Sequence, residues 1–163
     1  MARHVWSKAA AFVAVVTAGL LLAQPIAASS PQPASGTATV VTTTFTAPPR
    51  LADGNVILEA TQTGVVTGTF SGTFVENVRL VQHPSGLTTF EGTATLTGTA
   101  DGCGTGTIPF HLEGQGEGGV FEGKFVTIDH SASTVPVHAV LPFVQIGAGA
   151  GSTLTYSGTY HCD

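Results

Sequence analysis

The chain has 163 residues, of which 42% are hydrophobic and only 9% are charged, and its formal net charge is −5. A chain of this length fits one ordinary domain and can bury a core. Its acidic, lysine-poor composition repels phosphate backbones and anionic lipids, which argues against nucleic-acid partners and against electrostatic membrane binding.

The first 28 residues have the pattern of a secretory signal peptide. Arg3 and Lys8 supply two positive charges, residues 9–22 form an uncharged apolar run, and the segment closes on the small residues Ala27 and Ala28. A basic, then an apolar, then a small-residue region is typical of a cleaved signal. The apolar run is shorter than the roughly 20 residues that a membrane span needs. We therefore predict that residues 1–28 are removed and that the mature protein is secreted with no stable membrane span; a retained anchor is the alternative.

The mature chain divides into a short lead-in and one domain. Residues 29–36 are rich in Pro, Ser and Ala, and this composition predicts a disordered lead-in. Residues 37–163 then form the predicted domain. Together, residues 29–163 hold three Lys or Arg against ten Asp or Glu, which gives the mature protein a net charge of −7.

The dominant sequence period of this domain is two. In residues 90–100 the even positions are apolar or Gly and the odd positions are Glu or Thr, as in a half-buried strand. The same alternation marks residues 68–74, 104–112 and 154–160. Nothing after residue 28 keeps a helical period over three turns, and turn signals separate the runs at 52–54, 84–86, 101–102 and 117–119.

These runs predict an all-β fold. The predicted strands are residues 37–46, 55–63, 65–75, 78–83, 87–100, 104–113, 119–128, 135–145 and 152–161, with one of the nine merged or peripheral. Many strands joined by tight turns favour an antiparallel meander, and closure of the sheet would remove its exposed edges. We therefore predict an antiparallel up-and-down barrel of about eight strands.

Glycines inside the strands fall on the predicted core face between aromatic residues, as in Phe70-x-Gly72-x-Phe74. A missing side chain there lets the sheet coil and gives a neighbouring ring room. The barrel would be filled by its apolar face or would hold a small apolar ligand against it. The candidate ligand-binding residues are Phe70, Phe74, Leu96, Phe110, Phe121, Phe125, Tyr156 and Tyr160. On the even-numbered face of residues 68–74 and 90–100 we expect few groups that can move protons.

The two cysteines, Cys103 and Cys162, predict one disulfide bond, because export places them in an oxidising compartment. Metal binding is the alternative, since His161 neighbours Cys162. Cys103 lies between glycines, however, with no His or Cys at ligand spacing. We expect no metal and no cofactor.

No catalytic constellation stands out. The histidines of the mature chain are His83, His111, His130, His138 and His161. Asp129-His130-Ser131 cannot form a relay within itself, because adjacent residues of an extended chain point to opposite faces. Glu113, Glu117 and Glu122 could approach one another around a hairpin as glycosidase carboxylates do, but a solvated rim is the favoured interpretation.

The pattern of glycines and aromatics resembles a family of small bacterial proteins of unknown function with an allene-oxide-cyclase-like β-barrel. The resemblance covers roughly residues 37–128 and more loosely 147–160. It is carried by Gly64, Gly68, Gly72, Phe90-Glu91-Gly92, Gly98, Gly104, Gly106, Phe110-His111-Leu112, Gly118-Gly119 and Gly123-Lys124-Phe125. It implies an eight-stranded antiparallel barrel with a central cavity. Related barrels include cyclases, plant dirigent proteins and bacterial pericyclic enzymes, which steer a reactive apolar substrate by cavity shape.

Two functional hypotheses follow from the sequence. One is a secreted, non-enzymatic barrel that binds a small apolar ligand, and the other is a cyclase-like or isomerase-like enzyme that works by cavity shape. A cavity with a His, Tyr or Glu turned inward favours the enzyme, whereas a filled barrel excludes it. The sequence carries no signal for an oligomeric state.

Overall fold

The computed structural model describes residues 30–128 and 133–163 of the chain. The predicted signal peptide, 1–28, and the tripeptide Asp129-His130-Ser131 lie outside these residues. Among the residues described, none belongs to a helix that is long and apolar enough to cross a membrane.

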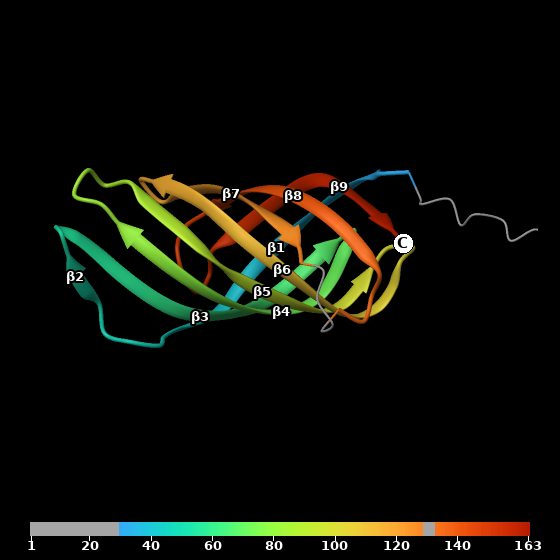
Figure 1. Ribbon diagram of the computed structural model, residues 1–163, viewed down its shortest axis with the longest axis horizontal. Helices are drawn as coiled ribbons and strands as arrows, with labels where there is room; N and C mark the ends of the chain where they lie inside the picture. Colours follow the sequence, from blue (N-terminus) through green and yellow to red (C-terminus); the bar gives the residue numbers. More distant parts are fainter. Residues whose placement is uncertain (1–29, 129–132) are drawn as a thin grey trace, which may run out of the picture.

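The described chain forms nine strands, and turns lie at the four positions predicted from turn signals, 52–54, 84–86, 101–102 and 117–119. The strands are β1 (Gln32–Phe45), β2 (Arg50–Ala52), β3 (Asn55–Gly68), β4 (Phe70–Gln82), β5 (Thr88–Ala100), β6 (Gly104–Glu117), β7 (Val120–Thr127), β8 (Val137–Ile146) and β9 (Thr153–Cys162). From β3 to β9 each strand pairs antiparallel with the next one along the chain, and β1 pairs with both β9 and β3. This double pairing of β1 closes an eight-stranded barrel, with β2 as a short extra strand on β3 (Figure 1). The predicted antiparallel barrel is confirmed.

The alternating pattern separates an apolar interior from a threonine-rich outer surface. Phe70 and Phe74 of β4 and Leu96 of β5 are buried, as the even-numbered face predicts. On the outside, threonines of neighbouring strands are hydrogen-bonded, for example Thr99 to Thr105 at 2.8 Å between hydroxyl oxygens. One face of each strand therefore builds the core and the other meets water.

The predicted disordered lead-in, residues 29–36, is wrong from residue 32 onward. Strand β1 begins at Gln32 and pairs with β9 through its first eight residues. Ala34 is buried against the core, and Gly36 lies opposite Tyr156. The barrel needs this segment to join β9 to β3, so pairing outweighs the Pro- and Ser-rich composition.

The expected strand breaks around residues 64 and 76–77 are also wrong. Strand β3 runs on to Gly68, and β4 continues from Phe70 to Gln82 without interruption. The reversal occurs at Thr69, after Gly68 with its positive φ of 113°. The backbone N–H of Thr69 donates to the carbonyl oxygen of Ser35 at 2.9 Å, which fixes the turn against β1. Residue 76 is therefore inside a strand and follows its alternation.

The two ends of the barrel differ. At one end the predicted disulfide bond, Cys103–Cys162, joins the β5–β6 turn to the end of β9 and closes a loop across 59 residues of sequence. At the same end the Tyr156 hydroxyl accepts a hydrogen bond from the backbone N–H of Phe70 at 3.0 Å. The opposite end, where β4 and β8 finish, carries the β2–β3 hairpin (left in Figure 1) and the loop between β8 and β9.

Candidate functional site

The barrel is hollow toward the end that carries β2. A cavity of about 180 Å³ lies there, and a second cavity of about 50 Å³ lies deeper in the barrel. Glu76 and Phe125 line both cavities. The walls of the larger cavity are mainly apolar, and its polar lining side chains are Thr43, Gln62, Glu76 and Gln145.

Glu76 is the buried acid of the interior. It lies on β4 between the inward-facing Phe74 and Val78, and only 9% of its surface is exposed. Among the described residues none forms a hydrogen bond or an ion pair with its carboxyl group. Burial in these apolar surroundings disfavours the charged form and raises the pKa of Glu76 to about 7. Near neutral pH the carboxyl group can therefore either accept or donate a hydrogen bond.

Gln62, on the neighbouring strand β3, is a second buried polar residue beside Glu76. It lies directly opposite Glu76 in the β3–β4 register, and 8% of its surface is exposed. Cross-strand partners that face the same side of a sheet have their Cβ atoms about 5 Å apart. The Gln62 amide and the Glu76 carboxyl group therefore present donors and acceptors to one region of the cavity.

Thr43 and Gln145 contribute polar atoms near the cavity mouth. A β-bulge between Val40 and Thr42 shifts the alternation of β1, so that Thr43 takes part in the cavity wall. The Thr43 Oγ1 atom is buried and has no hydrogen-bond partner among the described residues. The Gln145 Nε2 atom, by contrast, donates to the Gly147 carbonyl oxygen and to Ser152 Oγ, each at 3.2 Å, and is held by the β8–β9 loop.

The residues predicted to bind a ligand all belong to the inner wall, but they divide between the cavities. Phe121 and Phe125 line the larger one. The smaller one is lined by Phe70, Phe74, Leu96, Phe110, Phe125 and Tyr156. Tyr160 lines neither cavity, and it packs edge-on against Phe70 with ring centroids 5.8 Å apart. Seven of the eight predicted residues therefore line a cavity, and Tyr160 belongs to the packed core.

The sequence predicts few proton-transferring groups on the even-numbered faces of residues 68–74 and 90–100, and Glu76 lies just beyond the first of these ranges. The alternation through Phe70, Gly72 and Phe74 leads to Glu76 two residues later, so the signal was present in the sequence. The predicted strand break at residues 76–77 prevents Glu76 from being assigned to the inward face from the sequence. The inward position of Thr43 had no such signal, because a bulge leaves no mark in the sequence of β1.

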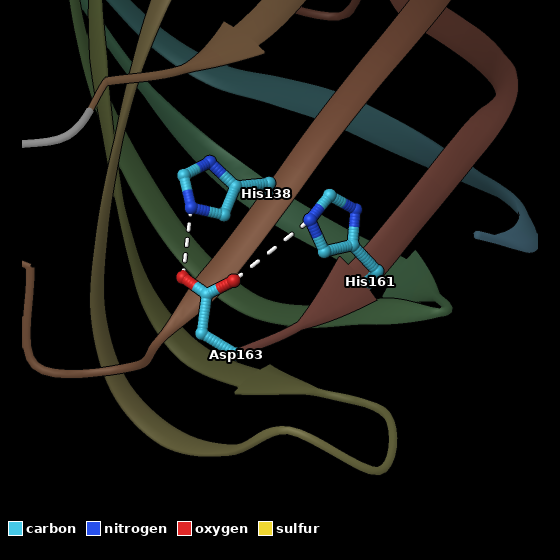
Figure 2. Close-up of side chains that lie close together, drawn as sticks. All are labelled: His138, His161 and Asp163. Atoms are coloured by element: carbon cyan, nitrogen blue, oxygen red, sulfur yellow. Dashed lines mark hydrogen bonds and ion pairs between the residues drawn. The ribbon is translucent and has the colours of Figure 1, made fainter. Parts of the chain in front are cut away.

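The histidines described by the structure lie outside the cavity. His111 is exposed on β6, and half-buried His83 hydrogen-bonds through Nδ1 to Asn55 Oδ1 at 2.9 Å. His138 and His161 face outward from neighbouring strands beside Asp163 (Figure 2). None of these four lines either cavity.

The three glutamates of the β6–β7 hairpin, Glu113, Glu117 and Glu122, are exposed on the outer surface. Lys124 Nζ lies 2.9 Å from Glu113 Oε1, and its hydrogen bond and charge lower the pKa of that carboxyl group. These acids form a solvated rim rather than a facing pair across a cleft.

Comparison of the sequence with known families gives no matching family model, and comparison with curated proteins gives no match either. The assignment of function therefore rests on the barrel, its cavity and the chemistry of Glu76.

Proposed function

We propose that this protein is an exported binding protein whose barrel holds a small, mainly apolar molecule that carries one hydrogen-bonding group. The observation that carries the proposal is the unpartnered carboxyl group of Glu76 in a cavity with mainly aromatic and aliphatic walls. Ligand sites are typically apolar with a few placed polar groups that fix orientation. The allene-oxide-cyclase-like character of the barrel is part of this proposal.

The cavity volume sets the size of the ligand. An apolar cavity of roughly 150 Å³ accepts a molecule the size of benzene. The larger cavity, at about 180 Å³, therefore suits a single ring or a short branched chain. The aromatic walls contributed by Phe90, Phe121 and Phe143 favour a flat ring over a flexible chain.

The buried polar groups select among such molecules. A hydroxyl group on the ring could donate to the Glu76 carboxylate, and a hydrogen bond to a charged group stabilises a complex by about 1.5–3 kcal/mol. A purely apolar ring leaves Glu76 without a partner. We therefore expect a ring with one hydroxyl group to bind more tightly than the same ring without it.

Fluorine NMR titrations with fluorobenzene and 4-fluorophenol test this proposal. The wild-type protein should bind both, with 4-fluorophenol about tenfold tighter. Glu76→Gln should reduce that preference, and Glu122→Gln, which alters an exposed acid, should leave it unchanged. Ala60→Phe, which fills the cavity from β3, should weaken both ligands. The proposal fails if a folded wild-type protein binds neither compound, or if Ala60→Phe leaves binding intact.

Export is the second part of the proposal. The disulfide bond accords with an oxidising compartment, and β1 begins shortly after the predicted cleavage site at Ala28. Trp6 is the single tryptophan of the chain, so cleavage would leave a mature protein without tryptophan. The mature protein should show tyrosine-type fluorescence and an N-terminus near Ser29. Tryptophan emission from the mature protein would contradict cleavage.

A second function, a cyclase-like or isomerase-like enzyme, is favoured by the pKa of Glu76. A general base or acid works best when its pKa lies near the working pH, and burial raises the pKa of Glu76 to about 7. The Glu76 carboxylate would remove a proton from a carbon next to a carbonyl group. The resulting neutral carboxyl group would return the proton to the same or another atom.

Deuterium exchange separates the two functions. Cyclohexanone in D₂O exchanges its protons next to the carbonyl group, and NMR follows the rate. The enzyme function predicts exchange above the buffer rate that Glu76→Gln abolishes and Glu122→Gln does not. Binding of cyclohexanone without faster exchange would support the binding protein alone.

A further inference from the structure

We propose that His138, His161 and Asp163 form a surface site for a divalent transition-metal ion, and that Zn²⁺ is the ion this donor set suits. The site is independent of the proposed ligand cavity. It lies at the end of the barrel where β8 begins and β9 finishes, whereas the cavity lies toward the opposite end.

Strand pairing brings the two histidines together. His138 of β8 and His161 of β9 are direct partners in the antiparallel register, and their side chains project outward. The imidazole rings are stacked, with centroids 5.1 Å apart and planes inclined by 22°. Two ring nitrogens are therefore offered side by side on the outer surface.

Asp163 completes the donor set (Figure 2). Its Oδ2 atom lies 2.8 Å from His138 Nε2, and its Oδ1 atom lies 3.8 Å from His161 Nε2. One ligand atom from each of the three residues lies within 4.8 Å of the others. Ligands of a tetrahedral zinc ion with bonds of about 2.0–2.1 Å lie about 3.3 Å apart. Small side-chain rotations would therefore bring these atoms onto one ion.

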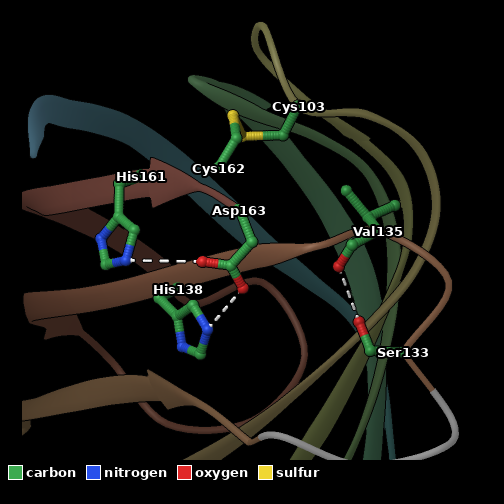
Figure 3. The surroundings of a disulfide bond; sticks show 7 residues. All are labelled: Cys103, Ser133, Val135, His138, His161, Cys162 and Asp163. Atoms are coloured by element: carbon green, nitrogen blue, oxygen red, sulfur yellow. Dashed lines mark hydrogen bonds and ion pairs between the residues drawn. A yellow bond between two sulfur atoms is a disulfide. The ribbon is translucent and has the colours of Figure 1, made fainter. Parts of the chain in front are cut away.

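Two constraints hold the third ligand near the histidines. Cys162, between His161 and Asp163 in the sequence, is tied to Cys103 by the disulfide bond (Figure 3). The backbone N–H of Asp163 also donates to the carbonyl oxygen of Pro136 at 3.1 Å. A site whose ligands are already positioned loses less conformational entropy when the ion binds.

The donor types define the class of metal. Imidazole nitrogens suit Zn²⁺, Cu²⁺ and Ni²⁺, whereas Ca²⁺ and Mg²⁺ prefer sites made of oxygen atoms. Both cysteines are in the disulfide bond, so no thiolate is present to select Cu⁺. All three side chains are between 33% and 51% exposed, so an ion can reach them without any opening of the barrel. Three protein ligands would leave a fourth position for water.

The sequence favours a disulfide bond over a metal site beside His161, and it does not indicate that His138, 23 residues earlier, lies next to His161. The β8–β9 register alone brings them together. The site was therefore visible only once the strand pairing was known.

Isothermal titration of the untagged, chelator-treated protein with Zn²⁺ tests the proposal, with imidazole NMR signals as a second measurement. We expect one ion per chain, with shifts confined to His138 and His161. His138→Asn, His161→Asn and Asp163→Asn should each weaken binding at least about tenfold. Mg²⁺ should not compete.

His111→Asn is the matched control, because His111 is also an exposed strand histidine near an acid, Glu113. It should leave zinc affinity unchanged. Absence of saturable zinc binding by the wild-type protein would overturn the proposal. So would zinc binding that survives the double substitution His138→Asn and His161→Asn, with the fold verified by circular dichroism.

Discussion

Glu76 carries an ionisable carboxyl group, yet its surroundings in the barrel are mainly apolar. A carboxylate among aromatic rings loses the solvation that water gives it, and no charged or hydrogen-bonding partner among the described residues replaces that solvation. Apolar residues occupy most neighbouring inward positions, so an apolar side chain at 76 would suit the core. An acid that is buried at a cost in stability beside a cavity is a candidate functional group.

The burial of Glu76 predicts a pH dependence of folding stability. Its pKa is about 7 in the folded protein, against 4.5 for an ordinary glutamate, so the folded state binds more protons between these values. The free energy of unfolding should therefore fall as the pH rises from 4.5 through 7, by an amount on the order of 3 kcal/mol. Denaturant titrations at a series of pH values measure this directly.

Glu76→Gln supplies the comparison, since a glutamine side chain does not ionise. The variant should match the wild type near pH 4.5 and exceed it in stability above pH 7. Glu122→Gln should keep the wild-type profile. Parallel profiles for the wild type and Glu76→Gln would show that residue 76 is not the buried acid.

Removal of the Tyr156 hydroxyl group should lower the free energy of unfolding. It accepts from the Phe70 N–H at 3.0 Å and lies within 3.4 Å of the carbonyl oxygens of Thr67 and Phe70. Tyr156→Phe should cost about 1–3 kcal/mol, because it leaves the buried Phe70 N–H without a partner. Tyr160→Phe, at a ring whose hydroxyl bonds to none of the described residues, should cost much less. Equal losses in thermal unfolding would contradict this account.

At the scale of the strands, the period of two predicts most of the barrel. The even-numbered faces of β4 and β5 point inward as expected, and the predicted turns at 52–54, 84–86, 101–102 and 117–119 are present. The sequence misplaces the β3–β4 reversal, because Thr69 is not a typical turn residue and Gly64 suggests an earlier break. It also does not predict the start of β1, because local composition carries no information about closure with β9.

Substitution of a strand glycine that faces the barrel interior should cause a steric clash. A side chain at Gly123 of β7 would meet the carbonyl oxygen of Glu113 and the ring of Phe143. Gly123→Phe should therefore destabilise the fold by about 1–3 kcal/mol or displace Phe143 into the cavity and weaken ligand binding. Glu122→Phe places the same side chain on the outer face and should change stability by about 0.5 kcal/mol or less. Wild-type stability and binding in Gly123→Phe would refute the inward assignment.

At the scale of the whole molecule, the two ends of the barrel differ. One end is cross-linked and packed, and the other contains a cavity. The disulfide bond and the Phe70, Tyr156 and Tyr160 cluster occupy one end, and the cavity with Glu76 occupies the other. Sequence periodicity predicts the closed sheet but not its cavity. The free volume depends on how Phe121, Phe125 and Phe143 pack after closure, and that packing has no periodic signature.

The disulfide bond predicts a particular pattern of stability losses. Closing a loop of 59 residues stabilises the fold by about 4 kcal/mol in the chain-entropy model. Cys103→Ser and Cys162→Ser should each remove this stabilisation, and the double substitution should be no worse than either, because both remove the same bond. Additive losses in thermal unfolding would show that the two cysteines act separately.

The most direct test of the central claim is a carbon-13 NMR titration of the Glu76 side-chain carboxyl group, with and without 4-fluorophenol. The account predicts a midpoint near pH 7 in the free protein and a change of that midpoint when the ligand fills the cavity. A Glu76 midpoint near the ordinary 4.5, with no response to ligand, would contradict both the burial of this acid and its role in the site.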